Sequence, residues 1–179
     1  YRQPGSSIKP IVYAAAFIKG YTPNTVLYDV VTNFSTDPAK PYEPHDYDLK
    51  ERGPVTIRQA LAGSLNIPAV KAIYLAGIDN VLNLARELGY TSFADRNRFG
   101  LSLVLGGGEV KLLEHANAFS AFAREGILHP INPILKIEDK DGKIIEEYKE
   151  DGGKKVLEAN IDRMLNDILS DNPARAYIF

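Results

Sequence analysis

The sequence of 179 residues contains no cysteine. This absence excludes disulfide bonds, thiolate nucleophiles and cysteine-based zinc or iron–sulfur sites. An excess of one charge is also missing, because 21 basic residues stand against 23 acidic ones. No apolar run approaches the ~20 residues that a membrane span needs. We therefore expect an ordinary globular segment that contacts neither nucleic acid nor membrane.

The spacing of apolar residues predicts a mainly helical chain of about six helices with one β-hairpin. From Ser6 to Gly20 the apolar positions cover nearly the whole circumference, which indicates a helix buried on most sides. Thr56 and Gln59 fit a capping box at the start of another helix. Further helices are expected from Thr56 to Gly63, Pro68 to Gly77, Asp79 (as the cap) to Gly89, Glu109 to Glu125 and Ala159 to Leu169.

The remaining segments read as loops and short extended pieces. A proline-rich excursion over residues 21–54 holds one short strand at Val26–Val31, and loops of this length are usually functional or wrapped over a surface. Leu101–Leu105 reads as extended, and two alternating runs around Asp141-Gly142 predict the hairpin.

The chain contains one Ser-x-x-Lys sequence, Ser6-Ser7-Ile8-Lys9. Residues three apart on a helix lie on one face, so the Lys9 amine can sit beside the Ser6 hydroxyl. A serine becomes a nucleophile when a base removes its proton, and a lysine serves as that base when burial depresses its pKa. The alternative is that Ser6 or Ser7 caps the helix and Lys9 extends to water.

A second polar element, Ser64-Leu65-Asn66, follows Gly63 in the turn between two predicted helices. Its hydroxyl can relay a proton, and its amide can hold a lysine and bind a substrate amide. Ser170-Asp171-Asn172 spells a Ser-Asp-Asn motif known from penicillin-recognising enzymes, but it follows the last helix, where such residues commonly cap structure. We prefer Ser64 and Asn66 as the catalytic element, because the sequence on either side of them carries the family resemblance described below.

Other candidate sites are weaker. Gly106-Gly107-Gly108 lacks the Gly-Lys-Ser/Thr ending of a phosphate loop and reads as a tight turn. His45-Asp46-Tyr47-Asp48 has residues that bind cations, although a solvated loop is the better interpretation. Tyr42 and Tyr47 are candidates for the wall of a substrate groove. The three histidines, His45, His115 and His129, lack metal-ligand spacing.

Four segments resemble, in order and with natural spacing, the transpeptidase domain of class A (bifunctional) penicillin-binding proteins. They are RQPGSSIKPIVYAAAF, PYEPHDYDLKERGPVTIRQALAGSLNIPAVKA, FGLSLVLGGGEVKLLEHANAFSAFAREG and MLNDILSDNPARA. Together they span nearly the whole chain. The resemblance implies that Ser6 is the acylated nucleophile, that Lys9 is the motif lysine, and that Ser64 and Asn66 form the second motif.

The family's third motif, Lys-Thr/Ser-Gly, occurs nowhere in the sequence. In the family it lies on a strand that binds the substrate carboxylate and helps to build the oxyanion hole. We therefore expect residues 1–179 to be a partial transpeptidase domain. Its fold class is the helical part of the α+β penicillin-binding-protein/β-lactamase-like fold, with most of the central antiparallel sheet missing.

The function implied by the resemblance is cross-linking of peptidoglycan stem peptides by a serine acyltransferase that β-lactams also acylate. This reaction requires no metal or organic cofactor. The resemblance also implies a membrane-anchored parent protein with a glycosyltransferase domain, acting on the extracytoplasmic side of the bacterial membrane. Two alternatives stay open: a D,D-carboxypeptidase or β-lactamase-type hydrolase of the same fold, and a non-catalytic penicillin-binding or sensor module.

We predict that the 179-residue chain by itself is catalytically weak. Loss of one oxyanion donor typically costs ~10²–10³ in rate, and the missing motif removes a whole wall of the site. Assays with a thioester or an acyl-D-Ala-D-Ala mimic should detect no turnover by this chain, and measurable turnover would contradict the prediction. The face that would cover the sheet is expected to be exposed and to favour self-association.

Overall fold

The structure, a computed structural model, describes residues 1–150 and 152–176. Its α-helices are α1 Lys9–Ile18, α2 Ile57–Ala62, α3 Asn66–Ala76, α4 Ile78–Glu87, α5 Leu112–Phe122, α6 Ala159–Leu169 and α7 Asn172–Arg175. Three 3₁₀ helices are η1 Gly5–Ile8, η2 Arg96–Arg98 and η3 Leu101–Leu105. The strands are β1 Val26–Asp29, β2 Gly53–Thr56, β3 Ile127–Leu128, β4 Lys136–Glu138, β5 Ile144–Glu147 and β6 Lys154–Lys155.

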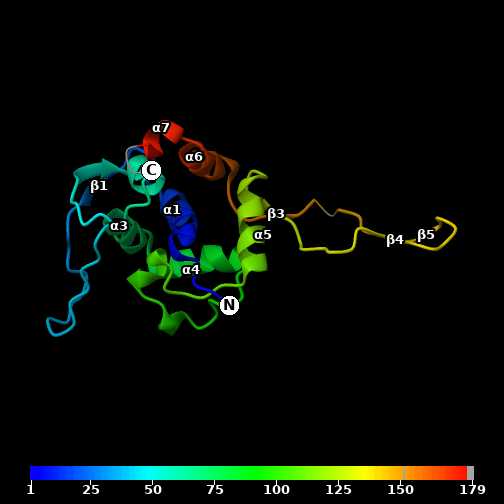
Figure 1. The fold of residues 1–179 in the computed structure, drawn as a ribbon, viewed down its shortest axis with the longest axis horizontal. Coiled ribbons are helices and arrows are strands. Elements are labelled where there is room, and N and C mark those ends of the chain that lie inside the picture. Colours follow the sequence, from blue (N-terminus) through cyan, green and yellow to red (C-terminus); the bar gives the residue numbers. More distant parts are fainter. Residues whose placement is uncertain (151, 177–179) are drawn as a thin grey trace.

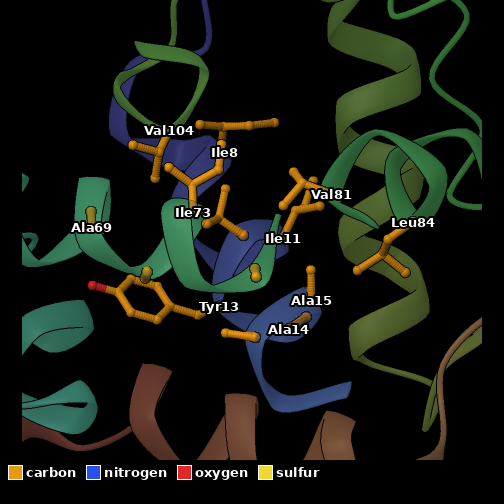
Figure 2. Close-up of a cluster of buried hydrophobic side chains, with 14 of the residues drawn as sticks. Ile8, Ile11, Tyr13, Ala14, Ala15, Ala69, Ile73, Val81, Leu84 and Val104 are labelled. Carbon is orange, nitrogen blue, oxygen red and sulfur yellow. The ribbon is translucent and has the colours of Figure 1, made fainter. Parts of the chain in front are cut away.

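Helix α1 is the centre of the fold, and helices α2, α3, α4 and α6 contact it (Figure 1). Every residue of α1 from Lys9 to Phe17 is buried, as the apolar circumference of this segment predicts. Alanines at 14–16 let the neighbouring helices approach closely, and α3, α4 and α6 all contact α1. Figure 2 shows side chains of α1, α3, α4 and η3 meeting in this core.

The expected fold class is confirmed: the chain is mainly helical, and within the described residues the strands form only three two-stranded antiparallel sheets. Strands β4 and β5 form the predicted hairpin, which projects away from the helices (Figure 1). The predicted strand near Val26 is β1, which pairs with β2 across the long excursion between them.

Several boundaries differ from the sequence-based expectation. The segment at Ser6 begins as the 3₁₀ turn η1, and α1 starts at Lys9 with Pro10 in its first turn. The capping box of Thr56 and Gln59 is confirmed. The expected cap at Asp79 is wrong, because Gly77 takes the cap position and the Asp79 side chain pairs with Arg96 instead.

Two further expectations are corrected around η3. Leu101–Leu105 is the 3₁₀ helix η3 rather than an extended segment, because the side chains of Leu103 and Val104 are both buried in the core. For so short an apolar run, periodicity does not distinguish a helix from a strand. Helix α5 is shorter than Glu109–Glu125 at both ends. Its expected first turn is extended because Val110 forms a β-bridge with Arg2.

Gly106 ends η3 in a left-handed conformation with φ +90° and lies against the backbone of Gly5, the residue before Ser6. A Cβ at position 106 would overlap the Gly5 backbone, and a side chain is strained at this φ in any case. The absence of a side chain at Gly106 therefore permits the contact that seats the turn carrying Ser6.

Gly106→Ala should lower the free energy of unfolding by ~3–4 kcal/mol, since left-handed strain adds to a backbone clash. Gly142→Ala is the matched control: Gly142 has φ +80° in the exposed hairpin, with no atom within 4 Å of the added Cβ. The control should lose only ~1–2 kcal/mol. Urea unfolding measures both values, and equal losses would show that the contact with Gly5 contributes nothing.

Candidate active site

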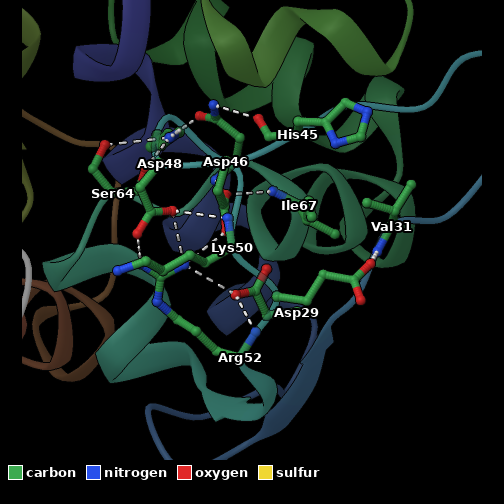
Figure 3. A network of polar contacts seen from close by, with 12 residues as sticks. Asp29, Val31, His45, Asp46, Asp48, Lys50, Arg52, Ser64 and Ile67 are labelled. Atoms are coloured by element: carbon green, nitrogen blue, oxygen red, sulfur yellow. Dashed lines mark hydrogen bonds and ion pairs between the residues drawn. The ribbon is translucent and has the colours of Figure 1, made fainter.

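The amine of Lys9, the first residue of α1, is enclosed by the turn between α2 and α3. Figure 3 shows Ser64 of this turn in a polar network with Asp46 and Arg52. Lys9 is only 1% exposed. Its Nζ donates to the main-chain carbonyl of Ser64 at 2.6 Å and to Oδ1 of Asn66 at 2.8 Å, and it lies 3.2 Å from the Ser64 hydroxyl. The structure thus brings Lys9 together with Ser64 and Asn66, which lie more than fifty residues after it in the sequence.

Burial changes the titration of Lys9. Loss of hydration lowers its pKa from 10.5 to about 8, while the nearby Asp46 carboxylate opposes the change. About a tenth of the amines are then neutral near pH 7, against roughly three in ten thousand for an ordinary lysine. A neutral amine has two N–H groups, which match the Ser64 carbonyl and Asn66 Oδ1, and its lone pair stays available for a proton.

The α2–α3 turn presents Ser64 to Lys9 through an unusual backbone conformation. Ser64 has φ +53°, in the left-handed region that non-glycine residues seldom occupy. The preceding Gly63 has an ordinary φ of −83°, so the unusual conformation belongs to Ser64 alone in this turn. This strain directs both oxygens of Ser64, the carbonyl and the hydroxyl, toward one lysine. Strained residues of this kind gather at functional sites.

Ser6 lies in η1, one turn before Lys9, and is exposed. Within residues 1–150 and 152–176, its hydroxyl forms no hydrogen bond. The neighbouring Ser7 is held from two sides: its hydroxyl donates to the Pro4 carbonyl at 2.6 Å and lies 2.9 Å from Nε2 of His115. The turn is therefore fixed through Ser7, which leaves the Ser6 hydroxyl open to solvent.

His115 connects this turn to helix α5 and to Tyr90. The Tyr90 hydroxyl lies 2.5 Å from Nδ1 of His115, and its ring packs edge-on against the imidazole. Because the Ser7 hydrogen points to Pro4, Nε2 of His115 must be the donor to Ser7 and Nδ1 the acceptor from Tyr90. Burial lowers the pKa of His115, which favours this neutral form. No pattern in the sequence indicates this series of hydrogen bonds from Pro4 through Ser7 and His115 to Tyr90.

Asp46 corrects the expectation that residues 45–48 form only a solvated loop. Its side chain is buried, and its carboxylate accepts from the main-chain N–H groups of Asn66 and Ile67. One signal in the sequence could have revealed it: Leu65 has no polar atom to cap α3, so the cap must come from elsewhere. Tyr47, by contrast, is fully exposed, and Tyr42 is partly buried against Phe34.

The Ser170-Asp171-Asn172 sequence makes contacts that stabilise the fold. Asp171 caps α7 by accepting from the N–H of Ala174 at 2.9 Å, and it pairs with Arg58 at 2.8 Å. The Ser170 hydroxyl donates back to the Asn166 carbonyl at 2.7 Å. These contacts join α2 to the C-terminal helices.

Among the described residues, no group of three or more histidine, aspartate or glutamate side chains is arranged to hold a metal ion. No helix in that part of the chain is long and apolar enough to cross a membrane.

Comparison with known proteins identifies the family. The model of the penicillin-binding protein transpeptidase domain matches residues 2–176. Penicillin-binding protein 1A of Aquifex aeolicus is 38% identical over 148 residues, which is 82% of this chain and 20% of that protein. The corresponding protein of Neisseria meningitidis serogroup A is 35% identical over 80% of this chain and 18% of its own length. The chain belongs to the transpeptidase domain family of class A penicillin-binding proteins.

Solved structures agree with this assignment. The crystal structure of penicillin-binding protein 1A from Haemophilus influenzae superimposes with a TM-score of 0.84 at 26% identity, over 92% of this chain and 29% of that one. Penicillin-binding protein A of Mycobacterium tuberculosis, solved as an imipenem acyl-enzyme complex, shares the fold with a TM-score of 0.82 at 18% identity, over 99% of this chain and 44% of that one. The chain spans about a fifth of the length of the Aquifex and Neisseria penicillin-binding proteins 1A.

The depressed pKa of Lys9 makes stability depend on pH. The folded pKa of about 8 lies below the unfolded value of 10.5, so the unfolded chain binds more protons between these values and the free energy of unfolding rises with pH there. From pH 7.5 to 9.5 we expect a gain of ~2 kcal/mol from this group. Urea unfolding should show the rise in the native chain and not in Lys9→Met; parallel pH profiles would contradict it.

Proposed function

We propose that this chain carries part of the active site of a serine D,D-transpeptidase that cross-links peptidoglycan stem peptides. The observation that carries the proposal is the buried Lys9 amine, held by Ser64 and Asn66 one turn after an open serine hydroxyl. Membership of the transpeptidase family supplies the reaction class. Peptide cross-linking is the acyl transfer that such a nucleophile and base would perform.

In the first half-reaction, Ser6 is the nucleophile and neutral Lys9 is its base. Lys9 takes the hydroxyl proton as the Ser6 oxygen bonds to the carbonyl carbon of the penultimate D-Ala. The main-chain N–H groups of the opening turn favour the negative charge that develops on the carbonyl oxygen. The C–N bond then breaks, and terminal D-Ala leaves as a neutral amine after receiving a proton from Lys9 through the Ser64 hydroxyl, which lies 3.2 Å from Nζ.

In the second half-reaction, the amine of a neighbouring stem peptide attacks the acyl-enzyme ester. Lys9 accepts a proton from this amine, directly or through Ser64, and the proton returns to the Ser6 oxygen as the ester bond breaks. Asn66 has one amide oxygen bound to Lys9, so it holds the base in place through both steps. No metal or organic cofactor takes part in this scheme.

β-Lactams are proposed as a second class of acylating agent at Ser6. Their strained amide resembles the acyl-D-Ala-D-Ala terminus, and opening of the ring leaves no separate leaving group to depart. The Mycobacterium tuberculosis neighbours carry imipenem and ceftriaxone as acyl-enzymes. We further propose that the full-length protein is membrane-anchored, carries a glycosyltransferase domain, and works on the extracytoplasmic side of a bacterial membrane.

Ser6→Ala should abolish covalent labelling of the full-length gene product by a fluorescent penicillin, since the nucleophilic oxygen is removed. Ser64→Ala should slow labelling by ~10²-fold or more, because one relay group is lost while the nucleophile remains. Ser170→Ala is the matched control and should label at the native rate. Gel fluorescence and peptide mass spectrometry measure these outcomes, and a label that persists in Ser6→Ala would overturn the assignment.

A further inference from the structure

We propose that Asp46 is a positioning residue for the Lys9 base: its carboxylate seats Asn66 at the start of α3, and it is the anion that faces the Lys9 amine. The inference rests on the proposed function only in giving Lys9 the role of base. Asp46 belongs to the long excursion between β1 and β2, where its side chain is 2% exposed.

The first argument is the cap of α3. Oδ1 of Asp46 accepts from the N–H of Asn66 and, at 3.2 Å, from that of Ile67. The third residue of the helix is Pro68, which has no N–H, so one carboxylate oxygen satisfies every donor of the opening positions. A carboxylate is also favoured at the positive end of a helix dipole. The excursion thereby determines where α3 and its first residue lie.

The second argument is the orientation of the Asn66 amide. Asn66 Nδ2 donates to the main-chain carbonyl of His45 at 3.0 Å, which leaves Oδ1 as the group that points to Lys9. A flipped amide would place an N–H donor against the lysine and lose both contacts. Residues 45 and 46 thus hold Asn66 from two sides, one through the side-chain amide and one through the backbone N–H.

The third argument is charge. Asp46 forms an ion pair with Arg52, which also pairs with Asp29 of β1 and with Asp48 of the excursion (Figure 3). The Asp46 charge also acts on the Lys9 amine of α1. Arg52 Nη1 lies 3.3 Å from Asp46 and 3.4 Å from Asp29. Burial and the neighbouring Asp46 raise the pKa of Asp29. The Asp46 carboxylate itself is held by Arg52 and by the two main-chain N–H groups at the start of α3.

These contacts give Asp46 two opposing effects on Lys9. Through Asn66 it places the acceptor that holds the amine, and through its charge it raises the pKa of Lys9 against the lowering effect of burial. Removal of the charge with retention of the cap should therefore make the amine lose its proton at a lower pH. Removal of both should also disorder the Asn66 contact.

Asp46→Asn tests the charge, because asparagine is a good helix cap and keeps an acceptor oxygen at the same position. The probe is the pH titration of the Lys9 ¹³Cε NMR signal in this chain, assigned by its absence in Lys9→Met. We expect the midpoint, about 8 in the native chain, to fall by ~0.5–1 unit. Asp48→Asn is the matched control: Asp48 binds Arg52 at 2.8 Å but is exposed, and among the described residues it forms no hydrogen bond or ion pair with α3.

Equal midpoints for Asp46→Asn, Asp48→Asn and the native chain would overturn the proposal. Asp46→Ala tests whether the cap on α3 holds Asn66 in position. The Asn66 side-chain amide signals should shift in Asp46→Ala and stay in place in Asp46→Asn. In the full-length product, the half-maximal pH for acylation by penicillin should fall in Asp46→Asn, with ~10-fold slower acylation in Asp46→Ala. Because the NMR readouts need no acylation, failure of the proposed function and failure of this inference are distinguishable.

Discussion

The fold depends on burying the Lys9 amine in its centre with hydrogen-bond acceptors around it. A lysine that is 1% exposed would lose several kcal/mol as an unpaired ion, so its surroundings must supply acceptors, lower its pKa, or do both. Here two oxygens of Ser64 and the amide oxygen of Asn66 surround Nζ. The strained φ of Ser64 and the early start of α3 at Asn66 are the local cost of presenting those acceptors to a residue on another helix.

The same requirement explains the extended excursion before β2. This segment has few apolar contacts, yet Asp46 within it is buried and supplies the cap that Leu65 lacks. Arg52 neutralises part of the acidic cluster that results. The helices alone would leave the N–H groups at the start of α3 unpaired, and the excursion is what completes the site.

Much of the fold could be predicted from local pattern. The buried circumference of α1, the capping box at Thr56 and the exposed hairpin each depend on neighbours within a few residues, where propensity and periodicity act directly. Two of the errors lie where a distant contact overrides that pattern. Val110 leaves the expected helix to pair with Arg2, and η3 coils so that Leu103 and Val104 are both buried.

By itself, the sequence determined the chemistry that is available: a Ser-x-x-Lys spacing, a Ser-x-Asn turn, and no cysteine or Lys-Thr-Gly motif. Only the tertiary structure decided which groups meet. It placed Lys9 against Ser64 and Asn66, Asp171 against Arg58, and Asp46 at the N-terminus of α3. The reason is physical: spacing of three residues fixes geometry within one helical turn, whereas contacts across fifty residues are set by which faces the core must bury.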